Sequence, residues 1–171
     1  MTALTTTQAS SLVSQQAAVL SSAQAVALNT DDLTNLTTSV LNALTVFDKL
    51  TTTQINSLTT RQVAALSTDQ IVALSSTQVG AFKTAQIGAL STTQIAAIET
   101  ADIKGLTTAQ VVALTSSQIG ALTTSQVSVL TTAQFAAIET ADIKGLTTDQ
   151  IVALSSTQVG ALTSGQVAAL T

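Results

Sequence analysis

The sequence predicts an all-α fold, a solenoid of very short capped helices with one helix in each eight-residue repeat. The octad L-[TS]-[TS]-x-Q-[IV]-x-A runs as fifteen consecutive copies from Leu50 to Ala169, so the chain is one small module repeated. Each copy carries the signals that start a helix. An eight-residue step also turns an α-helix by roughly 80°, so the Leu row would wind around a continuous helix and never form one buried stripe. Many short helices are therefore predicted.

The start signals are clear in the copy that begins at Leu106. Thr107 and Gln110 have the spacing of a capping box, in which each side chain accepts a hydrogen bond from the other residue's backbone amide. Leu106 and Val111 occupy the positions of a hydrophobic staple, which sets the angle at which the chain enters the helix. We expect the helix to begin at Thr107 and to last about one and a half turns. The two hydroxyl residues of the next octad then favour a new cap over a helix interior.

The core is predicted at the first and sixth positions of the octad. The first position is Leu in twelve copies, and its substitutes are Phe82, Ile98 and Ile138. The sixth is Ile or Val in every copy except the one with Phe135, and the fifth is Gln except at Asp102 and Asp142. Thr, Ser and Gln are expected to face solvent. We thus expect Leu114 and Ile119 to be buried, with Thr108 and Ser116 at least partly exposed. A small eighth residue, such as Gly105, would let neighbouring units approach closely.

A β-solenoid is the alternative fold. It would use strands such as 70–74 and turns such as 75–77. Pro is absent from the chain, and Asn and Gly do not occupy these turns. Ala, Gln and Leu favour helix over strand, so the helical form is preferred.

The chain divides into residues 1–49, a set of degenerate octads that we interpret as an N-terminal cap, and residues 50–171, the regular repeat. The looser period begins at Leu4 and continues at Leu12, Leu20, Leu28, Leu36 and Leu44. Ala replaces Ile or Val at Ala9, Ala17 and Ala25, and Gln is lost at Asp32, Val40 and Asp48. A two-residue phase slip lies between Leu44 and Leu50. Degenerate end units commonly act as caps in repeat proteins, and ordinary drift of old repeats is the alternative explanation.

A second period lies above the first. The segment IETADIKGL occurs at residues 98–106 and again at 138–146, five octads later. Duplication of a five-octad block explains it. The structural alternative is that five octads complete one superhelical repeat and bring the two charged segments into register. Their carboxylates, from Glu99 with Asp102 and from Glu139 with Asp142, are too few for the 6–8 oxygen ligands of Ca²⁺. A favourable interaction with a helix N-terminus explains these acids more simply.

Composition excludes several classes of function. The net charge is −4, and the basic residues are Lys49, Arg61, Lys83, Lys104 and Lys144, which form no patch able to neutralise a row of phosphates. Nucleic acid is therefore not an expected partner. The chain has no His and no Cys, which removes zinc sites, thiolate chemistry and the usual general base. We predict no catalytic, cofactor-binding or metal-binding residue, no cofactor and no enzymatic activity.

Two features bear on location. No apolar run approaches the ~20 residues that a membrane-spanning helix needs, so no membrane insertion is expected. The segment MTALTTTQASS lacks the basic and apolar regions of a Sec signal peptide.

The residues carry two family resemblances. The string 106–113, LTTAQVVA, resembles the opening helix of the repeats in TAL effectors of plant pathogens, but the base-reading loop and second helix have no counterpart here. The unit L-T-T-x-Q-[IV]-x-A-L is similar, over nearly the whole chain, to octapeptide arrays of large bacterial proteins that are described as adhesin-like or as haem-utilisation exoproteins. This second resemblance implies a structural or cell-surface role. A haem role lacks axial ligands, since His, Tyr and Cys are missing and Met1 is the only Met.

The expected function is that of a non-enzymatic structural repeat protein, a rigid spacer or a self-assembling element of a bacterial surface or filament structure. We expect self-association, as a filament or end-to-end oligomer, through an open C-terminal end that exposes Leu162, Val167 and Leu170. The alternative is a repeat-surface binding module of adhesin or ice-binding type, suggested by hydroxyl pairs such as Thr107 and Thr108; their other explanation is helix capping. An extracellular or cell-surface location is expected, with a cytoplasmic filament as the alternative.

Overall fold

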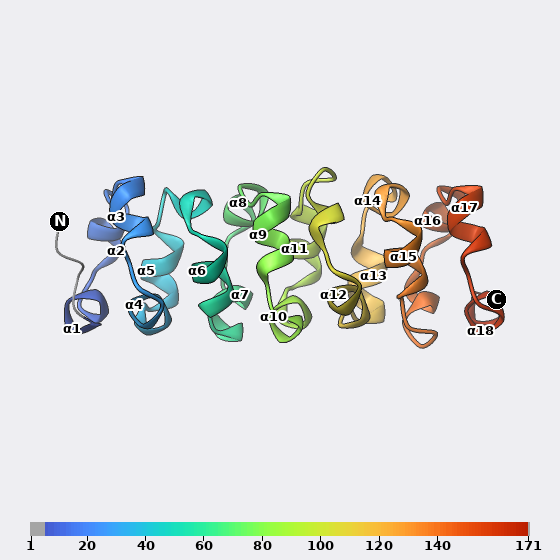
Figure 1. The fold of residues 1–171 in the computed structure, drawn as a ribbon, viewed down its shortest axis with the longest axis horizontal. Coiled ribbons are helices and arrows are strands. Elements are labelled where there is room, and N and C mark those ends of the chain that lie inside the picture. The colour runs from blue at the N-terminus through green and yellow to red at the C-terminus, as the bar shows by residue number, and fades with distance from the viewer. Residues whose placement is uncertain (1–5, 171) are drawn as a thin grey trace.

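A computed structural model describes residues 6–170, so Leu4 and Thr171 lie outside the described part. The chain forms an elongated array of short helices with the two ends of the chain at opposite ends (Figure 1). Within residues 6–170 there are eighteen α-helices and three 3-10 helices and no strand. The all-α prediction is confirmed in this respect, and the β-solenoid alternative is wrong.

The α-helices contain four to six residues each and the 3-10 helices three. The irregular N-terminal part contains α1 (Thr6–Ser10), α2 (Ser14–Ala17), α3 (Ser22–Val26), α4 (Thr30–Asn35), α5 (Thr38–Asn42) and η1 (Phe47–Lys49). The regular part begins with α6 (Thr52–Ser57), α7 (Thr60–Ala64), α8 (Thr68–Val72), α9 (Ser76–Ala81), α10 (Thr84–Ala89), α11 (Thr92–Ala97) and η2 (Ile103–Gly105). It continues with α12 (Thr108–Val112), α13 (Ser116–Ala121), α14 (Thr124–Val129), α15 (Thr132–Ala136), η3 (Ile143–Gly145), α16 (Thr148–Val152), α17 (Ser156–Gly160) and α18 (Ser164–Ala169).

The capping box predicted for the octad is present. Thr107 is the N-cap of α12, and its hydroxyl accepts a hydrogen bond from the Gln110 amide at 3.2 Å. The Gln110 Oε1 accepts one from the Thr107 amide at 2.6 Å. The two bonds satisfy two of the amides that a helix start leaves without a partner. Leu106 and Val111 are both buried, as the hydrophobic staple requires.

Each helix ends because the next Leu and Thr are extended. After α6, Leu58 has φ −53° and ψ 144°, and Thr59, the N-cap of α7, has φ −74° and ψ 155°. Two extended residues form a corner, and the following helix leaves in a new direction. The same corner recurs along the array, so short straight helices alternate with sharp changes of direction (Figure 1).

The helices stack in three rows, because nearly every helix packs on the helix three octads away. The first row contains α1, α4, α6, α9, η2, α14 and α16; the second contains α2, α5, α7, α10, α12, α15 and α17; the third contains α3, η1, α8, α11, α13, η3 and α18. Three successive octads, here called a triplet, therefore supply one helix to each row. The core is a continuous strip between the rows.

The predicted core positions are confirmed. Leu114 is 2% exposed and Ile119 is fully buried, whereas Thr108 is exposed and Ser116 is intermediate. The same alternation holds through the inner octads. Burial at two positions of every octad provides the main apolar driving force for stacking.

The unit between Leu44 and Leu50 is two residues shorter than an octad, and the stacking continues across it. The six residues from Leu44 to Lys49 end in the 3-10 helix η1 in place of an α-helix. Phe47 fills the core there with 2% exposure. The rows continue across the shortened unit, since α4 still packs on α6 and α5 on α7.

The proposal that five octads complete one superhelical repeat is wrong. Stacking has a period of three octads, so the two IETADIKGL segments lie in different rows, η2 in the first and η3 in the third. The expectation of one α-helix per octad also fails in these two units. Glu99 stands where Thr or Ser usually caps the helix, and Asp102 makes no side-chain cap bond, so a 3-10 turn forms instead.

Candidate functional site

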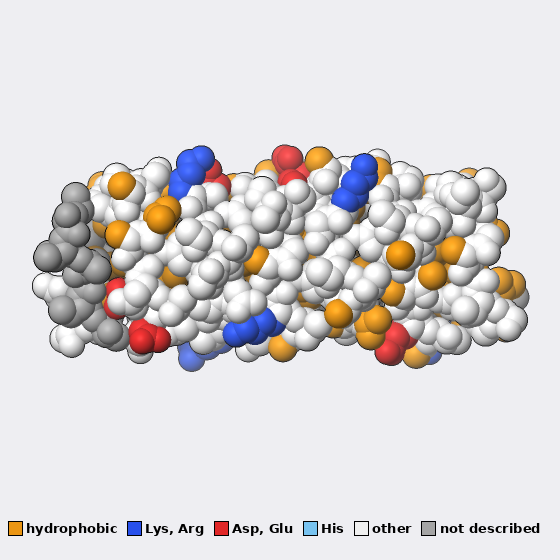
Figure 2. All heavy atoms as spheres, viewed as in Figure 1, with side chains coloured by type: hydrophobic (Ala, Val, Ile, Leu, Met, Phe, Trp, Pro, Cys, Tyr) orange, Lys and Arg blue, Asp and Glu red, His pale blue; other side chains and the backbone are white. Residues whose placement is uncertain are grey.

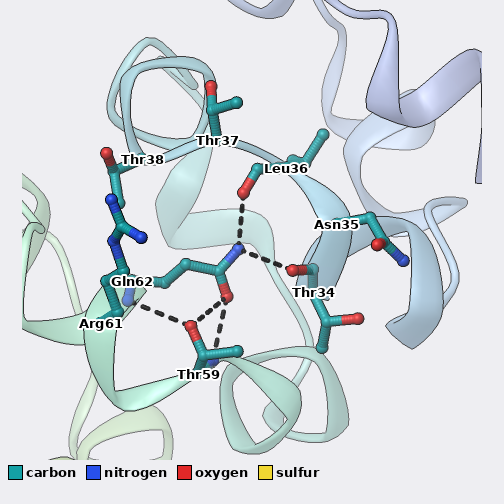
Figure 3. Close-up of a pocket in the computed structure, with 8 residues that line it drawn as sticks. All are labelled: Thr34, Asn35, Leu36, Thr37, Thr38, Thr59, Arg61 and Gln62. Atoms are coloured by element: carbon teal, nitrogen blue, oxygen red, sulfur yellow. Dashed lines mark hydrogen bonds between the residues drawn. The ribbon is translucent and has the colours of Figure 1, made fainter.

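The most regular polar feature of the array is a buried glutamine that joins two helices, shown for Gln62 in Figure 3. Its Oε1 accepts a hydrogen bond from the Thr59 amide at 2.9 Å, which caps the start of α7. Its Nε2 donates to the carbonyl oxygens of Leu33 at 2.8 Å and Leu36 at 2.9 Å, at the end of α4. The side chain is buried, with 3% exposure. One amide therefore caps the start of its own helix and the end of an earlier one.

This double role explains why the fifth position is Gln. A helix end leaves carbonyl groups without partners, and burying them unpaired is costly. The Gln amide has an acceptor and two donors in one group, whereas a Glu carboxylate has no donor. Only the amide serves both helix termini at once.

The bridge recurs with a fixed register along the regular array. In most copies Nε2 reaches the carbonyls 28 and 30 or 31 residues earlier, as Gln126 does with Ile98 and Ile95. The buried members are Gln54, Gln62, Gln70, Gln78, Gln86, Gln94, Gln110, Gln118, Gln126, Gln134, Gln150, Gln158 and Gln166. The expectation that Gln faces solvent is thus wrong. The Thr–Gln spacing indicated the cap, but nothing local in the octad indicates the distant carbonyl acceptors.

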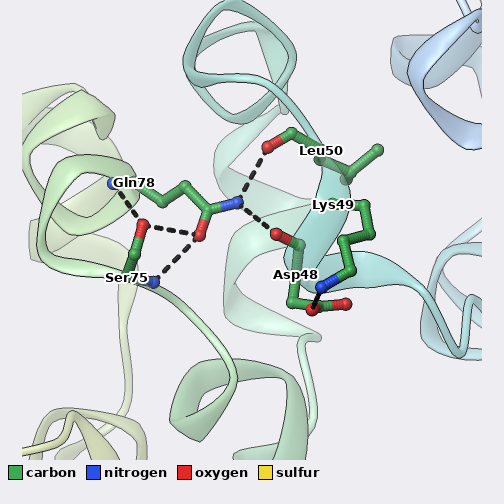
Figure 4. Close-up of polar contacts among 5 residues, drawn as sticks. All are labelled: Asp48, Lys49, Leu50, Ser75 and Gln78. Atoms are coloured by element: carbon green, nitrogen blue, oxygen red, sulfur yellow. Dashed lines mark hydrogen bonds and ion pairs between the residues drawn. The ribbon is translucent and has the colours of Figure 1, made fainter. Parts of the chain in front are cut away.

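The bridge tolerates the shortened unit at η1 (Figure 4). The Nε2 of Gln78 donates to the carbonyl oxygens of Asp48 at 2.9 Å and Leu50 at 2.8 Å. Beside it, the Lys49 Nζ lies 2.6 Å from the Asp48 Oδ2. The Lys49 side chain is 55% exposed, so this ion pair contributes little to stability.

One buried side-chain polar atom among residues 6–170 has no hydrogen-bond partner, the Oδ1 of Asp32. Asp32 stands at the glutamine position of α4, and its Oδ2 accepts from the Asn29 amide at 3.3 Å. It therefore performs the capping half of the glutamine role. The Asp side chain has no amide N–H groups, so it lacks the two donors with which Gln performs the other half.

A surface hollow adjoins the Gln62 bridge. A hollow of about 390 Å³ is lined by Thr34, Asn35, Leu36, Thr37, Thr38, Thr59, Arg61 and Gln62 (Figure 3). Arg61 is the only titratable side chain in this lining, and Gln62 is occupied by its bridge. The hollow thus has no acid–base pair and no nucleophile beside a base.

The acidic segments do not form a metal centre within the described residues, where no group of three or more His, Cys, Asp or Glu side chains is found. Asp142 instead accepts a hydrogen bond from the Ser116 hydroxyl at 2.7 Å. Asp102 and Asp142 each lie at the N-terminus of a three-residue 3-10 helix, where neither side chain makes a cap hydrogen bond.

Glycine at the eighth position allows a very close approach of backbones, as predicted. A Cβ on Gly105 would lie 2.0 Å from the Ser76 carbonyl oxygen, and one on Gly145 would lie 2.1 Å from that of Ser116. Neither glycine has a positive φ. They are required for packing between helices of one row and not for a turn.

The hydroxyl pairs are divided in their roles. Thr107, Thr115 and Thr123 each accept a bond from the amide of the Gln three residues later, at 3.1–3.3 Å. These first hydroxyls are caps, which supports the capping explanation of the pairs. The three octads concerned also lie in three different rows, so their second hydroxyls do not line one face.

The C-terminal end of the array exposes core positions. Val159 and Val167 are each 50% exposed, whereas Val79 and Val127 are fully buried at the same octad position. Leu162 and Leu170 are intermediate. The predicted exposed row is therefore present, with Val167 as its most open member. Figure 2 shows apolar side chains at this end of the molecule.

A scan of protein families matches the ALTTAQ repeat at residues 47–76, 71–97, 95–132 and 135–171, which is more than half of the chain. The chain belongs to the ALTTAQ repeat family. No curated protein and no solved structure matches it. The ALTTAQ matches cover the part in which the Gln bridges are regular. No helix in the described part of this ALTTAQ array is long and apolar enough to cross a membrane.

Proposed function

We propose that this ALTTAQ array is a solenoid and that it serves as a non-enzymatic structural element of a bacterial surface or filament structure. Its mechanical role would be that of a rigid spacer that also self-assembles. The observation that carries this proposal is the series of buried Gln bridges, because each one ties a helix to the helix end behind it in the array. Bending the rod would have to break buried hydrogen bonds, which is costly.

The rest of the molecule supports a structural role. The inner octads bury both core positions, and the surface hollow at Gln62 offers no pair of reacting groups. The resemblance to adhesin-like bacterial arrays supports an extracellular or surface location, with a cytoplasmic filament as the alternative.

Rigidity is directly measurable, because the chain has no Cys and two can be introduced for spin labels. Thr60 and Thr132 are exposed first residues of α7 and α15, three steps apart in the second row. Helices packed at 8–10 Å predict a separation of roughly 25–30 Å. We expect the T60C/T132C pair to give a single narrow distance distribution by pulsed electron resonance. A broad distribution would reject the rigid spacer.

A further inference from the structure

Charge is distributed unevenly among the three rows. The second row has no acidic residue within residues 6–170, and its two charged residues, Arg61 and Lys83, are both basic. The first row has five acidic residues and Lys104, and the third has four acidic residues together with Lys49 and Lys144. The acidic residues of the first row are Asp31, Asp32, Glu99, Asp102 and Asp149, and those of the third are Asp48, Asp69, Glu139 and Asp142. One row of an acidic chain is thus positive.

Lys83 occupies a position that normally holds a helix cap. In every other octad with Gln at the fifth position, from Gln54 to Gln166, the second residue is Thr or Ser. Lys83 is the N-cap of α10 and makes no side-chain cap hydrogen bond, although a hydroxyl there would stabilise the helix start. Its side chain is exposed and forms no ion pair with another described residue. A local rule broken without a structural gain is typical of a functional surface.

Arg61 lies on the neighbouring helix of the same row. Its helix, α7, packs against α10, and its side chain is exposed and forms no ion pair within residues 6–170. Figure 3 shows this side chain extending toward Thr38 at the hollow. Two cations without an ion-pair partner therefore lie on adjacent helices of a row that has no acidic residue.

We propose that the second row is a lateral docking surface for a second copy of this chain and that it lies along the first row of that copy. The first row is the most acidic of the three, and Asp31, Glu99 and Asp149 on it are exposed. Complementary charge favours this pairing over second row against second row. The inference deepens the self-assembly part of the proposed function and rests on it.

Parallel packing satisfies both copies at once. A two-fold axis along the rods sets the face between the first and second rows of one copy on the same face of the other, so each second row meets a first row. Arg61 then lies at the level of α6 and Lys83 at the level of α9, and neither helix is charged. Asp31 on α4 and Glu99 before η2 are one helix step further along, roughly 8–10 Å. That step is comparable with the Debye length in physiological salt.

The face is large enough for a stable pair. The chain has an accessible surface of 7885 Å², and a third of this area exceeds the ~800 Å² that each partner contributes to a standard interface. After Lys83, the second row has no charged residue in α10, α12, α15 or α17. Docking this part therefore removes no charged group from water, which would be costly.

The first experiment reverses the charge of the second row. Sedimentation equilibrium of the full chain should show monomers and dimers, with a dissociation constant that rises with salt. R61E/K83E should raise that constant at least about tenfold. The matched control is K49E/K144E, which gives the same net charge by reversing the lysines of the third row and should have an effect below about threefold. Equal effects of the two variants, or a wild-type chain that is monomeric at every concentration, overturn the inference.

The second experiment tests the partner surface. E99K/D149K should weaken association about as much as R61E/K83E, whereas D69K/E139K should not. These two variants are matched, because Asp69 and Asp149 both occur in the string TDQIV, and Glu99 and Glu139 both occur in IETADIKGL. A larger effect of D69K/E139K would place the contact on the third row and overturn the proposed pairing.

Mixing provides a further check. An equimolar mixture of R61E/K83E and E99K/D149K should associate more tightly than either variant alone, because each retains the row that the other has lost. A mixture no tighter than the separate variants overturns the pairing of second row with first. If R61E/K83E still dimerises like wild type but loses binding to polyglutamate, the second row serves an acidic polymer and not a second copy.

The outcome is separable from that of the spacer proposal. The T60C/T132C distance is measured on the R61E/K83E background, in which association is blocked. A narrow distance with no wild-type association leaves the spacer intact and rejects the docking. A broad distance with wild-type association has the opposite meaning.

Discussion

Replacing Gln126 by Glu separates the two roles of the bridging amide. Nε2 of Gln126 donates to the carbonyl oxygens of Ile95 at 3.1 Å, Ala96 at 3.2 Å and Ile98 at 2.6 Å, and the side chain is 1% exposed. A carboxylate would keep the acceptor for the Thr123 amide, now bonded at 2.7 Å. It would, however, place a second oxygen against three carbonyls.

The expected loss of stability at pH 7 is about 3–5 kcal/mol, the cost of an uncompensated buried charge. Losing the donor alone would account for about 1–3 kcal/mol of this. Burial and the carbonyl dipoles raise the pKa of the new carboxyl group in the folded state above its unfolded value near ~4.3. The penalty is then smallest below pH ~4, where the protonated group can donate to a carbonyl, and grows as the pH rises above that value.

The matched control is Q24E. Gln24 has the same capping contact with Ser21, and its Nε2 has no carbonyl acceptor within residues 6–170. We expect this variant to remain within about 0.5 kcal/mol of wild type. Urea unfolding followed by circular dichroism at pH 7 and pH 3.5 gives the comparison. Equal losses for Q126E and Q24E, or a Q126E penalty that does not change with pH, would refute the bridge as a stabilising element.

Three further tests, which use five substitutions, address other parts of the octad by urea or thermal unfolding. Thr123→Ala removes a cap whose hydroxyl accepts at 3.1 Å and should cost about 0.5–2 kcal/mol; an unchanged midpoint would argue against the capping box. Leu114→Ala, at a buried core position, should cost about 2–5 kcal/mol, whereas Thr108→Ala, at an exposed position, should cost much less. Similar losses for these two would indicate another packing face. Gly105→Ala would place a Cβ 2.0 Å from the Ser76 carbonyl oxygen and should cost at least about 1–3 kcal/mol. Gly88→Ala meets nothing closer than 3.5 Å in α10 and should stabilise by about 0.5–1 kcal/mol, so a loss at Gly88 would contradict the steric explanation.

Much of the fold was predictable because its signals are local. Thr107 and Gln110 lie within one turn, and their spacing alone predicts the cap. The first and sixth positions are apolar in almost every copy, and this predicts the core. Leu114 and Ile119 are buried as expected.

The long-range features were not predictable in the same way. The octad pattern is nearly the same in every copy, so it does not indicate how many octads bring the chain back to the same row. The partner of Gln126 lies 28 residues away at Ile98, and no property of either residue indicates that separation. Gln is buried because of this long-range contact, which the octad sequence does not reveal. The prediction that Gln faces solvent was wrong for that reason. The 3-10 turns that follow Asp102 and Asp142 form in octads that lack both residues of the capping box, the hydroxyl N-cap and the Gln.

The stacking period of three octads also affects how such an array can lengthen. The two IETADIKGL segments lie five octads apart, and five is not a multiple of three. Their charged residues therefore fall in different rows, with η2 in the first and η3 in the third. A separation of three or six octads would instead place both segments in one row, with one lysine above the other. Lengthening by blocks of five octads would thus distribute the rare charges around the circumference of the rod.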